Sequence, residues 1–297
     1  EGKALARVDD MVIFIPFVIP GDVVDVQITK KRKSYCEGRV VRFIQYSDNR
    51  KEPFCPHFGI CGGCKWQILP YEDQLKAKHQ QVYDQLSRIG KIELPEFNYI
   101  LGSVQTMQYR NKLEFGCSNK RWLTQEDIDS KKTFDNMNAI GFHITGAFDK
   151  IYPITQCQLM DDLQNQIRNH IYEYAIKQNI SFYDLRNQHG LLRSIMVRNS
   201  NNNEWMVLVQ FRFDESNDKE KALALLEDLA NHFPQITSLL YVDNQKCNDT
   251  FNDLPVEVYK GNDYIYELME DLKFKVGPKS FYQTNTEQAY HLYDVAR

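Results

Sequence analysis

The first 46 residues consist of short apolar runs separated by turn signals, and no helical period is present. The runs are rich in Val and Ile, and Pro-Gly and Gly separate them, which is typical of strands joined by tight turns. They are ALARV, MVIFIPFV, VVDVQITKK and EGRVVRFIQ. This pattern predicts a small five-stranded barrel of the oligonucleotide-binding type. One interpretation of the four runs is that this chain lacks the first strand of the barrel.

Beyond residue 50 the spacing of apolar residues becomes helical in three places. A helix is predicted over 70–88, with Gly90 placed to end it, and further helices are predicted over 159–178 and 219–232. LLRSIMVRN and EWMVLVQFRF form a predicted hairpin around the turn SNNN, and SLLYVDN is a further strand. Helices that alternate with paired strands indicate a separate α/β domain.

The final residues, TEQAYHLYDVAR, have the pattern of an opening helix with its apolar positions on one side. The chain starts at Glu1 without a methionine and stops at Arg297 within this predicted helix. We therefore expect the chain to be a fragment of a longer protein.

Composition excludes several classes of protein. With 42% hydrophobic and 26% charged residues, the 297-residue chain is neither disordered nor fibrous and is long enough for two domains. The longest apolar stretch, 11–20, is too short to span a bilayer and contains two prolines. No charged-then-apolar signal segment occurs at the start, so we expect a cytoplasmic protein.

The net charge of −4 hides an uneven distribution. Residues 1–90 carry 14 Lys and Arg against 11 Asp and Glu, whereas residues 91–297 carry 22 against 29. Four cations, Lys30 to Lys33, sit together at a predicted strand-to-strand turn. This run is either an ordinary solvated turn or a phosphate-contacting loop on a nucleic-acid-binding barrel. Global charge therefore does not exclude a nucleic-acid partner.

Seven cysteines are present, and their odd number and uneven spacing argue against a secreted disulfide framework. Three of them, Cys55, Cys61 and Cys64, lie within CPHFGICGGC. The glycines of this segment let the backbone wrap closely, so that three sulfurs can face one point. The segment is therefore a candidate metal site.

Four ligands are needed to complete a tetrahedral zinc site or to hold a [4Fe–4S] cluster. Three clustered cysteines with one remote cysteine favour the cluster, and Cys157 in PITQCQL is the leading candidate for the fourth ligand. Cys36, Cys117 and Cys247 compete for that position. Zinc with His57 as a fourth ligand and a redox dithiol at Cys61 and Cys64 are the alternatives.

Taken together, these segments resemble the S-adenosylmethionine-dependent RNA (uracil-5-)-methyltransferases, most closely the RumA-type 23S rRNA branch. The resemblance covers essentially the whole chain. The segment from EGKALARV to CEGRVV is similar to the family's TRAM domain, a barrel of oligonucleotide-binding fold, and CPHFGICGGCKWQ is similar to its most specific segment. Further matches are YRNKLEF, GFHITGAFDKI, LLRSIMVR and SFYQTNTEQAYHLY.

The resemblance implies a [4Fe–4S] cluster bound by four cysteines. Cys55, Cys61 and Cys64 match the clustered ligands, and Cys157 matches the fourth because IYPITQCQL looks like the stretch around it. It also implies that Gln283 contacts S-adenosylmethionine.

An aromatic residue near the flipped target uracil corresponds to Phe281. Asn285 matches a residue of the same loop. Besides Phe281, cations of the barrel turn and of the central domain are expected to contact RNA. They are Lys31, Arg32, Lys33, Arg110 and Lys112.

The catalytic residues of the family have no counterpart in the chain. Methyl transfer to carbon 5 of uracil needs a thiolate that adds at carbon 6 and a carboxylate that removes the carbon-5 proton. None of the seven cysteines matches the family's catalytic cysteine, and no glycine-rich strand–helix turn is available for the cofactor. We expect the fragment to be inactive by itself and the intact enzyme to use S-adenosylmethionine.

The sequence thus predicts an α+β multi-domain chain. It has an OB-like TRAM barrel over 1–50, a central α/β domain with the iron–sulfur site over 51–275, and the lead-in to a Rossmann-like methyltransferase domain over 276–297. The expected function is RNA recognition in a monomeric enzyme that acts on 23S rRNA, without a membrane partner. The alternatives are the tRNA branch of the same family and a non-catalytic, metal-stabilised RNA-binding protein.

Overall fold

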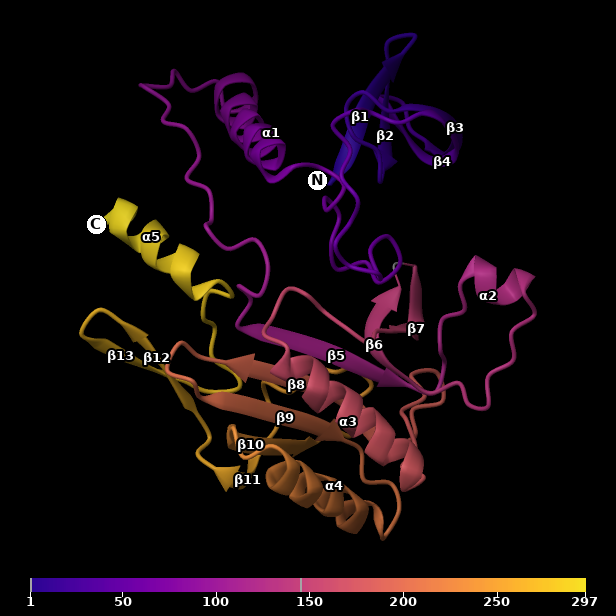
Figure 1. Cartoon of the computed structure of the whole chain (residues 1–297), viewed down its shortest axis with the longest axis vertical. Helices are drawn as coiled ribbons and strands as arrows, with labels where there is room; N and C mark the ends of the chain where they lie inside the picture. The colour runs from indigo at the N-terminus through magenta and orange to yellow at the C-terminus, as the bar shows by residue number, and fades with distance from the viewer. Residues whose placement is uncertain (1, 145) are drawn as a thin grey trace. The chain divides into compact units, whose positions relative to one another are not determined.

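The four Val- and Ile-rich segments at the N-terminus form one sheet in the computed structural model, which describes residues 2–144 and 146–297. Its strands are β1 (Lys3–Val8), β2 (Met11–Pro16), β3 (Val23–Lys31) and β4 (Tyr35–Gln45). The order is β1-β2-β4-β3, and β2 and β4 are parallel whereas the other pairs are antiparallel (Figure 1). The predicted strands are confirmed. Four strands are present among the described residues of this sheet, not the five that were expected.

Residues up to Val104 belong to one compact unit, and Gln105–Arg297 form a second. The first unit contains the four-stranded sheet, the cysteine segment and α1 (Tyr71–Asp84), which continues as a π-helical turn, η1 (Gln85–Ile89). The N–H of Gly90 closes this turn by donating to the carbonyl of Gln85. The helix predicted over 70–88 is therefore confirmed, including its end at the glycine.

A seven-stranded sheet organises the second unit, in the order β11-β10-β9-β8-β5-β6-β7. Its strands are β5 (Lys112–Ser118), β6 (Ala139–Ile144), β7 (Ala147–Pro153), β8 (Leu192–Asn199), β9 (Trp205–Phe211), β10 (Ile236–Asp243) and β11 (Glu257–Gly261). Only β9 and β10 pair in parallel, and the predicted β8–β9 hairpin is antiparallel. A separate hairpin consists of β12 (Ile265–Met269) and β13 (Leu272–Val276).

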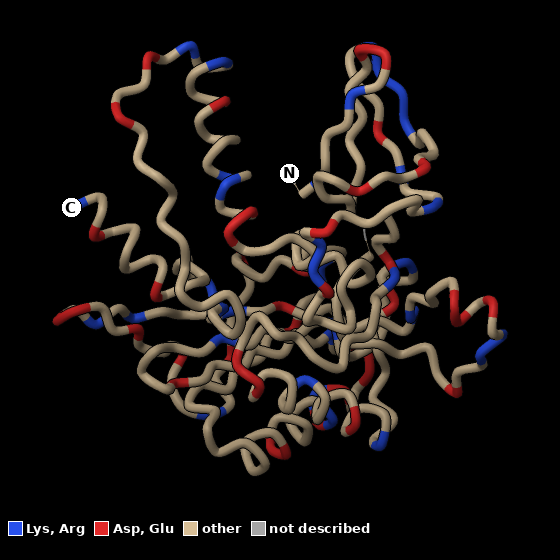
Figure 2. The backbone as a smooth tube through the Cα atoms, turned by 45° about the horizontal axis from the view of Figure 1, so that its top comes forward, with Lys and Arg blue, Asp and Glu red and all other residues tan. Residues whose placement is uncertain are grey.

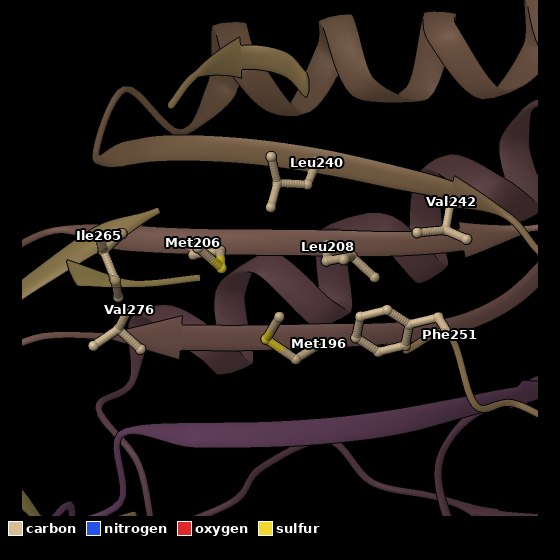
Figure 3. Packing of buried hydrophobic residues seen from close by; sticks show 8 residues of the cluster. All are labelled: Met196, Met206, Leu208, Leu240, Val242, Phe251, Ile265 and Val276. Carbon is tan, nitrogen blue, oxygen red and sulfur yellow. The ribbon is translucent and has the colours of Figure 1, made fainter. Parts of the chain in front are cut away.

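The core of this unit lies on both faces of the central strands. Every residue of β9 is buried, which explains its continuous apolar run rather than an alternating one. α3 (Leu163–Lys177) and α4 (Asp218–His232) lie over one face of the sheet (Figure 1). On the other face, side chains of β8, β9 and β10 pack with Phe251 and with residues of the β12–β13 hairpin (Figure 3).

Two further helices complete the second unit. α2 (Gln125–Asp129) is short and begins with a capping box, in which Thr124 and Asp127 satisfy each other's backbone N–H groups. α5 (Thr286–Ala296) confirms the helix predicted at the end of the chain. None of the helices formed by residues 2–144 and 146–297 is both long and apolar enough to cross a membrane.

Candidate functional site

A cavity of about 500 Å³ lies in the second unit, lined by residues that precede β5, follow β8, end β12 and begin α5. Most of the residues that line it have polar side chains, including Arg110, Asn111, Asn285 and Glu287. It therefore adjoins the segment 280–286, in which the sequence predicts the cofactor and target-base contacts. Polar groups that converge on a concave site are typical of ligand binding.

Asn111 ties this segment to the start of β5. Its side-chain amide donates to the carbonyl of Gln283 and to the hydroxyl of Thr286, both at 2.9 Å. Its backbone N–H donates to the carbonyl of Thr284 at 2.9 Å. Three hydrogen bonds from one buried residue therefore hold the backbone around Gln283.

Glu267 is the buried acid beneath this connection, with 2% of its surface exposed. It accepts hydrogen bonds from the hydroxyl of Thr286 at 3.1 Å and from the N–H of Asn201 at 3.3 Å. Burial raises the pKa of the Glu267 carboxyl, although the hydrogen bonds from Asn201 and Thr286 act against that rise. The carboxyl therefore holds its proton to a higher pH than an exposed glutamate.

Residues 281–283 differ sharply in their exposure. Phe281 is 85% exposed, so its ring is available to pack against a bound base. Tyr282 points inward, and burial, reinforced by Glu267, raises its pKa to about 12. Gln283 is half-buried and its carbonyl is engaged by Asn111.

Arg198 supports the same segment from β8. Its guanidinium is buried and donates to the carbonyls of Gly277 at 3.0 Å and Ser280 at 3.1 Å. These bonds fix the turn that leads into Phe281. Sequence analysis missed Asn111, Glu267 and Arg198 as site residues, because nothing in a single sequence distinguishes a buried polar strand residue from an exposed one.

The two cations predicted to contact RNA next to β5 occupy different positions. Arg110 lines the cavity and donates from Nε to the carbonyl of Lys112 at 2.8 Å. The ammonium group of Lys112 pairs with Glu114 at 2.5 Å and does not line the cavity. Arg110 is therefore the better placed of the two for a ligand in this cavity.

The basic turn lies between β3 and β4 in the first unit. Lys31, Arg32 and Lys33 are exposed, and none of them forms an ion pair with the part of the chain that the structure describes. The N–H of Arg32 donates to the carbonyl of Tyr35 at 2.8 Å, which closes the turn. Lys30 of this run has an acidic partner, Glu37 at 3.3 Å. The predicted phosphate contacts are thus sterically and electrostatically available.

The clustered cysteines form a series of tight turns in the first unit. The N–H of Phe58 donates to the carbonyl of Cys55, and the N–H of Cys61 donates to the carbonyl of His57. Burial raises the pKa of the Cys61 thiol, while N–H groups of Gly63 and Cys64 donate to its sulfur and oppose that rise. Amide donors directed at a sulfur are a feature of thiolate ligands to iron.

Cys157 lies in the second unit, between β7 and α3, where it is buried. Its backbone is held by Asn165, which accepts from its N–H at 2.7 Å, and by Gln164, which donates to its carbonyl at 3.1 Å. Among residues 2–144 and 146–297, no three His, Cys, Asp or Glu side chains converge as a metal site requires. Cys55, Cys61 and Cys64 belong to the first unit and Cys157 to the second, so the four-cysteine site stays a prediction.

Arg168 adds an unexpected charge beside Cys157. It is 1% exposed, and its guanidinium donates to the side-chain oxygens of Gln164, Asn165 and Asn169 at 3.1–3.2 Å. Burial lowers the pKa of Arg168 to about 10, although the nearby Cys157 acts against that change. Arg168 forms no ion pair with a described carboxylate, so a negative charge near Cys157 would be favoured.

Comparison with known proteins gives relatives over the whole length of the chain. Residues 1–41 match the family described as TRAM domain. The chain is 56% identical over its full length to an uncharacterized RNA methyltransferase of Bacteroides thetaiotaomicron and 52% identical to one of Porphyromonas gingivalis. It spans 65% and 64% of the lengths of these two relatives.

One solved structure extends the likeness to the fold. The Pyrococcus abyssi tRNA (uracil-54, C5)-methyltransferase in complex with S-adenosyl-L-homocysteine matches 99% of this chain with a TM-score of 0.65. The two proteins are 23% identical, and the match covers 64% of the archaeal chain. The mixed α/β architecture with N-terminal TRAM strands is therefore that of a known methyltransferase structure.

Proposed function

We propose that this chain is the RNA-recognition part of an S-adenosylmethionine-dependent methyltransferase that modifies carbon 5 of uridine. The observation that carries the proposal is the 56% identity, over the whole of this chain and 65% of the relative, to a protein named as an RNA methyltransferase. The TRAM match supports the RNA partner, and the fold likeness to a uracil C5 methyltransferase supports the reaction. The proposed place of action is the cytoplasm.

In this proposal, residues 281–283 serve the reaction from a fixed backbone. Phe281 packs against the target base, and Gln283 contacts S-adenosylmethionine, which supplies the methyl group when bound. Asn111 and Arg198 hold the segment in place through the carbonyls of Gln283 and Ser280. Positioning of this kind reduces the entropy lost when the substrates meet.

The nucleophilic cysteine and the base are proposed to lie in the remainder of the whole protein. In this proposal, none of the seven cysteines of this chain is the catalytic one. Cys117, for example, is fully buried, and burial raises its pKa well above the usual range, which suppresses the thiolate that the reaction needs.

Methylation by the whole protein tests the proposal. The protein is incubated with labelled S-adenosylmethionine and with total RNA from a strain that lacks it, and 5-methyluridine is mapped by mass spectrometry. Phe281→Ala should lower the rate of methyl transfer at least tenfold with little effect on stability, because the ring is exposed. Val295→Ala, which removes another exposed apolar side chain, is the matched control. The absence of 5-methyluridine in every RNA would refute the assignment.

The RNA substrate is proposed to be 23S rRNA, on the resemblance of the cysteine segment to that branch. The archaeal protein with a similar fold is named as a tRNA methyltransferase, which makes tRNA the second candidate. The same mapping separates the two candidates. Labelled 5-methyluridine in 23S rRNA supports the first assignment, whereas labelled 5-methyluridine in tRNA alone would show that the enzyme belongs to the tRNA branch.

An iron–sulfur cluster at Cys55, Cys61, Cys64 and Cys157 is the proposed second cofactor. Its support is the cysteine spacing, the amide donors to the sulfur of Cys61, and the buried guanidinium of Arg168 beside Cys157, which has no carboxylate partner among the described residues. With four cysteine ligands it would organise the fold rather than transfer electrons.

Anaerobic purification tests the cluster directly. Absorbance near 400 nm and stoichiometric iron are expected in the wild type and should be lost in Cys61→Ala. Cys247→Ala, which replaces an exposed cysteine, should keep both signals. A colourless protein with bound zinc would contradict the cluster in favour of the zinc alternative.

A further inference from the structure

A second cavity of about 500 Å³ lies in the second unit beside β7, the edge strand of its sheet, and plays no part in the site described above. The segment 119–123 lines it together with Lys150 of β7, Met137 and residues of α2. Its wall is anchored to β7, because the N–H of Trp122 donates to the carbonyl of Ile151 at 2.8 Å. We call this cavity the Trp122 pocket.

Two cations of the Trp122 pocket have an aromatic partner and no acidic one. The ammonium of Lys150 lies 5.5 Å from the centroid of the Trp122 ring, and the guanidinium of Arg121 lies 4.4 Å from that of Phe134. Neither cation forms an ion pair with any described residue. The Nε of Arg121 is also buried without a hydrogen-bond partner among those residues. Both cations can therefore still bind an anion.

Three acidic side chains in this region are already engaged. Both charge signs occur along the loop that carries α2 (Figure 2). The carboxylate of Asp127 accepts the N–H and hydroxyl of Thr124, Asp184 pairs with Lys120 at 2.9 Å, and Asp149 pairs with Arg186. These three carboxylates thus already have hydrogen-bond or ion-pair partners, and none of them forms an ion pair with Arg121 or Lys150 among the described residues.

These features match the chemistry of a single-stranded nucleotide. Aromatic rings and guanidinium planes stack on unpaired bases, and cations beside them bind the flanking phosphates. A cavity of this volume is of the size that encloses a small ligand. An acidic peptide would use the cations but would leave the Trp122 ring without a stacking partner.

We propose that the Trp122 pocket binds one nucleotide of a single-stranded segment of the RNA substrate, with the base against Trp122 and a phosphate between Arg121 and Lys150. The inference rests on the proposed RNA-modifying function, because it assumes an RNA partner. It adds a contact in the central domain, away from both the basic turn and Phe281.

Fluorescence titration with a uridine-rich RNA of about 12 nucleotides tests the pocket. Trp122→Ala should weaken binding about tenfold, which is the loss of one stacked base. Trp122→Phe should retain most of the affinity, because phenylalanine can also stack on a base. The quenching of tryptophan fluorescence by RNA should be lost, because the proposal assigns it to Trp122, while Trp66 and Trp205 still give a fluorescence signal. Lys150→Gln should weaken binding, whereas Lys219→Gln, at an exposed position on α4, should not.

The outcomes separate this inference from the proposed function. If folded Trp122→Ala binds RNA as tightly as the wild type, or if Trp122→Phe shows undiminished quenching, the pocket assignment is wrong and the proposed function stands. If the wild-type chain binds no RNA, both fail. Displacement of the RNA by polyglutamate at equal charge concentration would also overturn the nucleotide assignment, since it would identify a general anion site.

Discussion

At the scale of single residues, the candidate site depends on buried polar side chains that hold the backbone rather than contact a ligand. Arg198 is the clearest case, because its two terminal nitrogens, Nη1 and Nη2, donate to carbonyls of the turn before Phe281. A buried carbonyl that loses a charged donor keeps the full cost of its desolvation. The position of Phe281 therefore depends on a strand residue that lies far from it in the sequence.

Replacement of Arg198 by Met should reduce the free energy of unfolding by about 2–4 kcal/mol, since two carbonyls lose a charged partner. Urea denaturation measures the change. Arg39→Met, at an exposed arginine bound to Gln27, should stay within about 0.5 kcal/mol of the wild type. Equal effects of the two substitutions would show that the buried bonds add nothing.

Glu267 gives the site a pH dependence with a definite sign. Its pKa is raised in the folded state, so the folded protein keeps a proton that the unfolded chain releases near its ordinary value of 4.5. The stability due to this group is fully present below that value and falls as pH rises through the folded pKa.

Glu267→Gln cannot titrate, so its stability relative to the wild type should increase as pH rises from about 4 to 8. The substitution should also lower the free energy of unfolding by about 1 kcal/mol at every pH, because the new amide nitrogen faces the N–H of Asn201. Urea denaturation across this pH range, with exposed Glu257→Gln as the control, measures the trend. A difference that shrinks or stays flat with pH would contradict the buried-acid interpretation.

At the scale of elements, α5 depends on the residue that precedes it. Asn285 is the N-cap, and its side-chain oxygen accepts from the N–H of Gln288 at 3.0 Å. Arg110 forms a β-bridge with the same residue, so the helix start and the cavity wall are one structure. Loss of the cap should therefore loosen the cavity together with the helix.

Asn285→Ala should lower the free energy of unfolding by about 1 kcal/mol, whereas Asn285→Asp should retain the cap. Hydrogen exchange of the amides of the first turn of α5 should accelerate in the alanine variant, with α4 unchanged. Unchanged exchange at Gln288 would mean that the cap does not hold the helix.

At the scale of the whole molecule, a net charge of −4 has to coexist with RNA binding. Local cations resolve this, because the exposed run Lys31 to Lys33 has no acidic partner among the described residues. Counterion release makes affinity for single strands fall with salt by a slope of about 0.7 per phosphate contact.

Lys31→Gln should therefore reduce the slope of log affinity against log salt by about 0.7, with a uniform loss of affinity across RNA sequences. Fluorescence anisotropy over a salt series measures it. Arg88→Gln, which removes an exposed cation already paired with Asp84, should leave the slope unchanged. An unchanged slope in Lys31→Gln would remove the basic turn from the RNA interface.

Local pattern alone predicted most of the elements of this protein. The helix ending at Gly90, the β8–β9 hairpin and α5 all follow from apolar spacing and turn residues, which act over a few positions. Cysteine spacing also predicts metal chemistry, because thiol ligands occur in short, recognisable runs, and this stays a prediction.

Only the tertiary structure decided which polar residues are buried and what they hold. Asn111, Arg168 and Arg198 read as ordinary solvated strand or helix residues, yet each binds groups brought near by the fold. The Trp122 pocket likewise joins residues before α2 with Lys150 of β7. Burial and pairing depend on contacts between distant segments, and the periodicity of one segment carries no information about its neighbour in space.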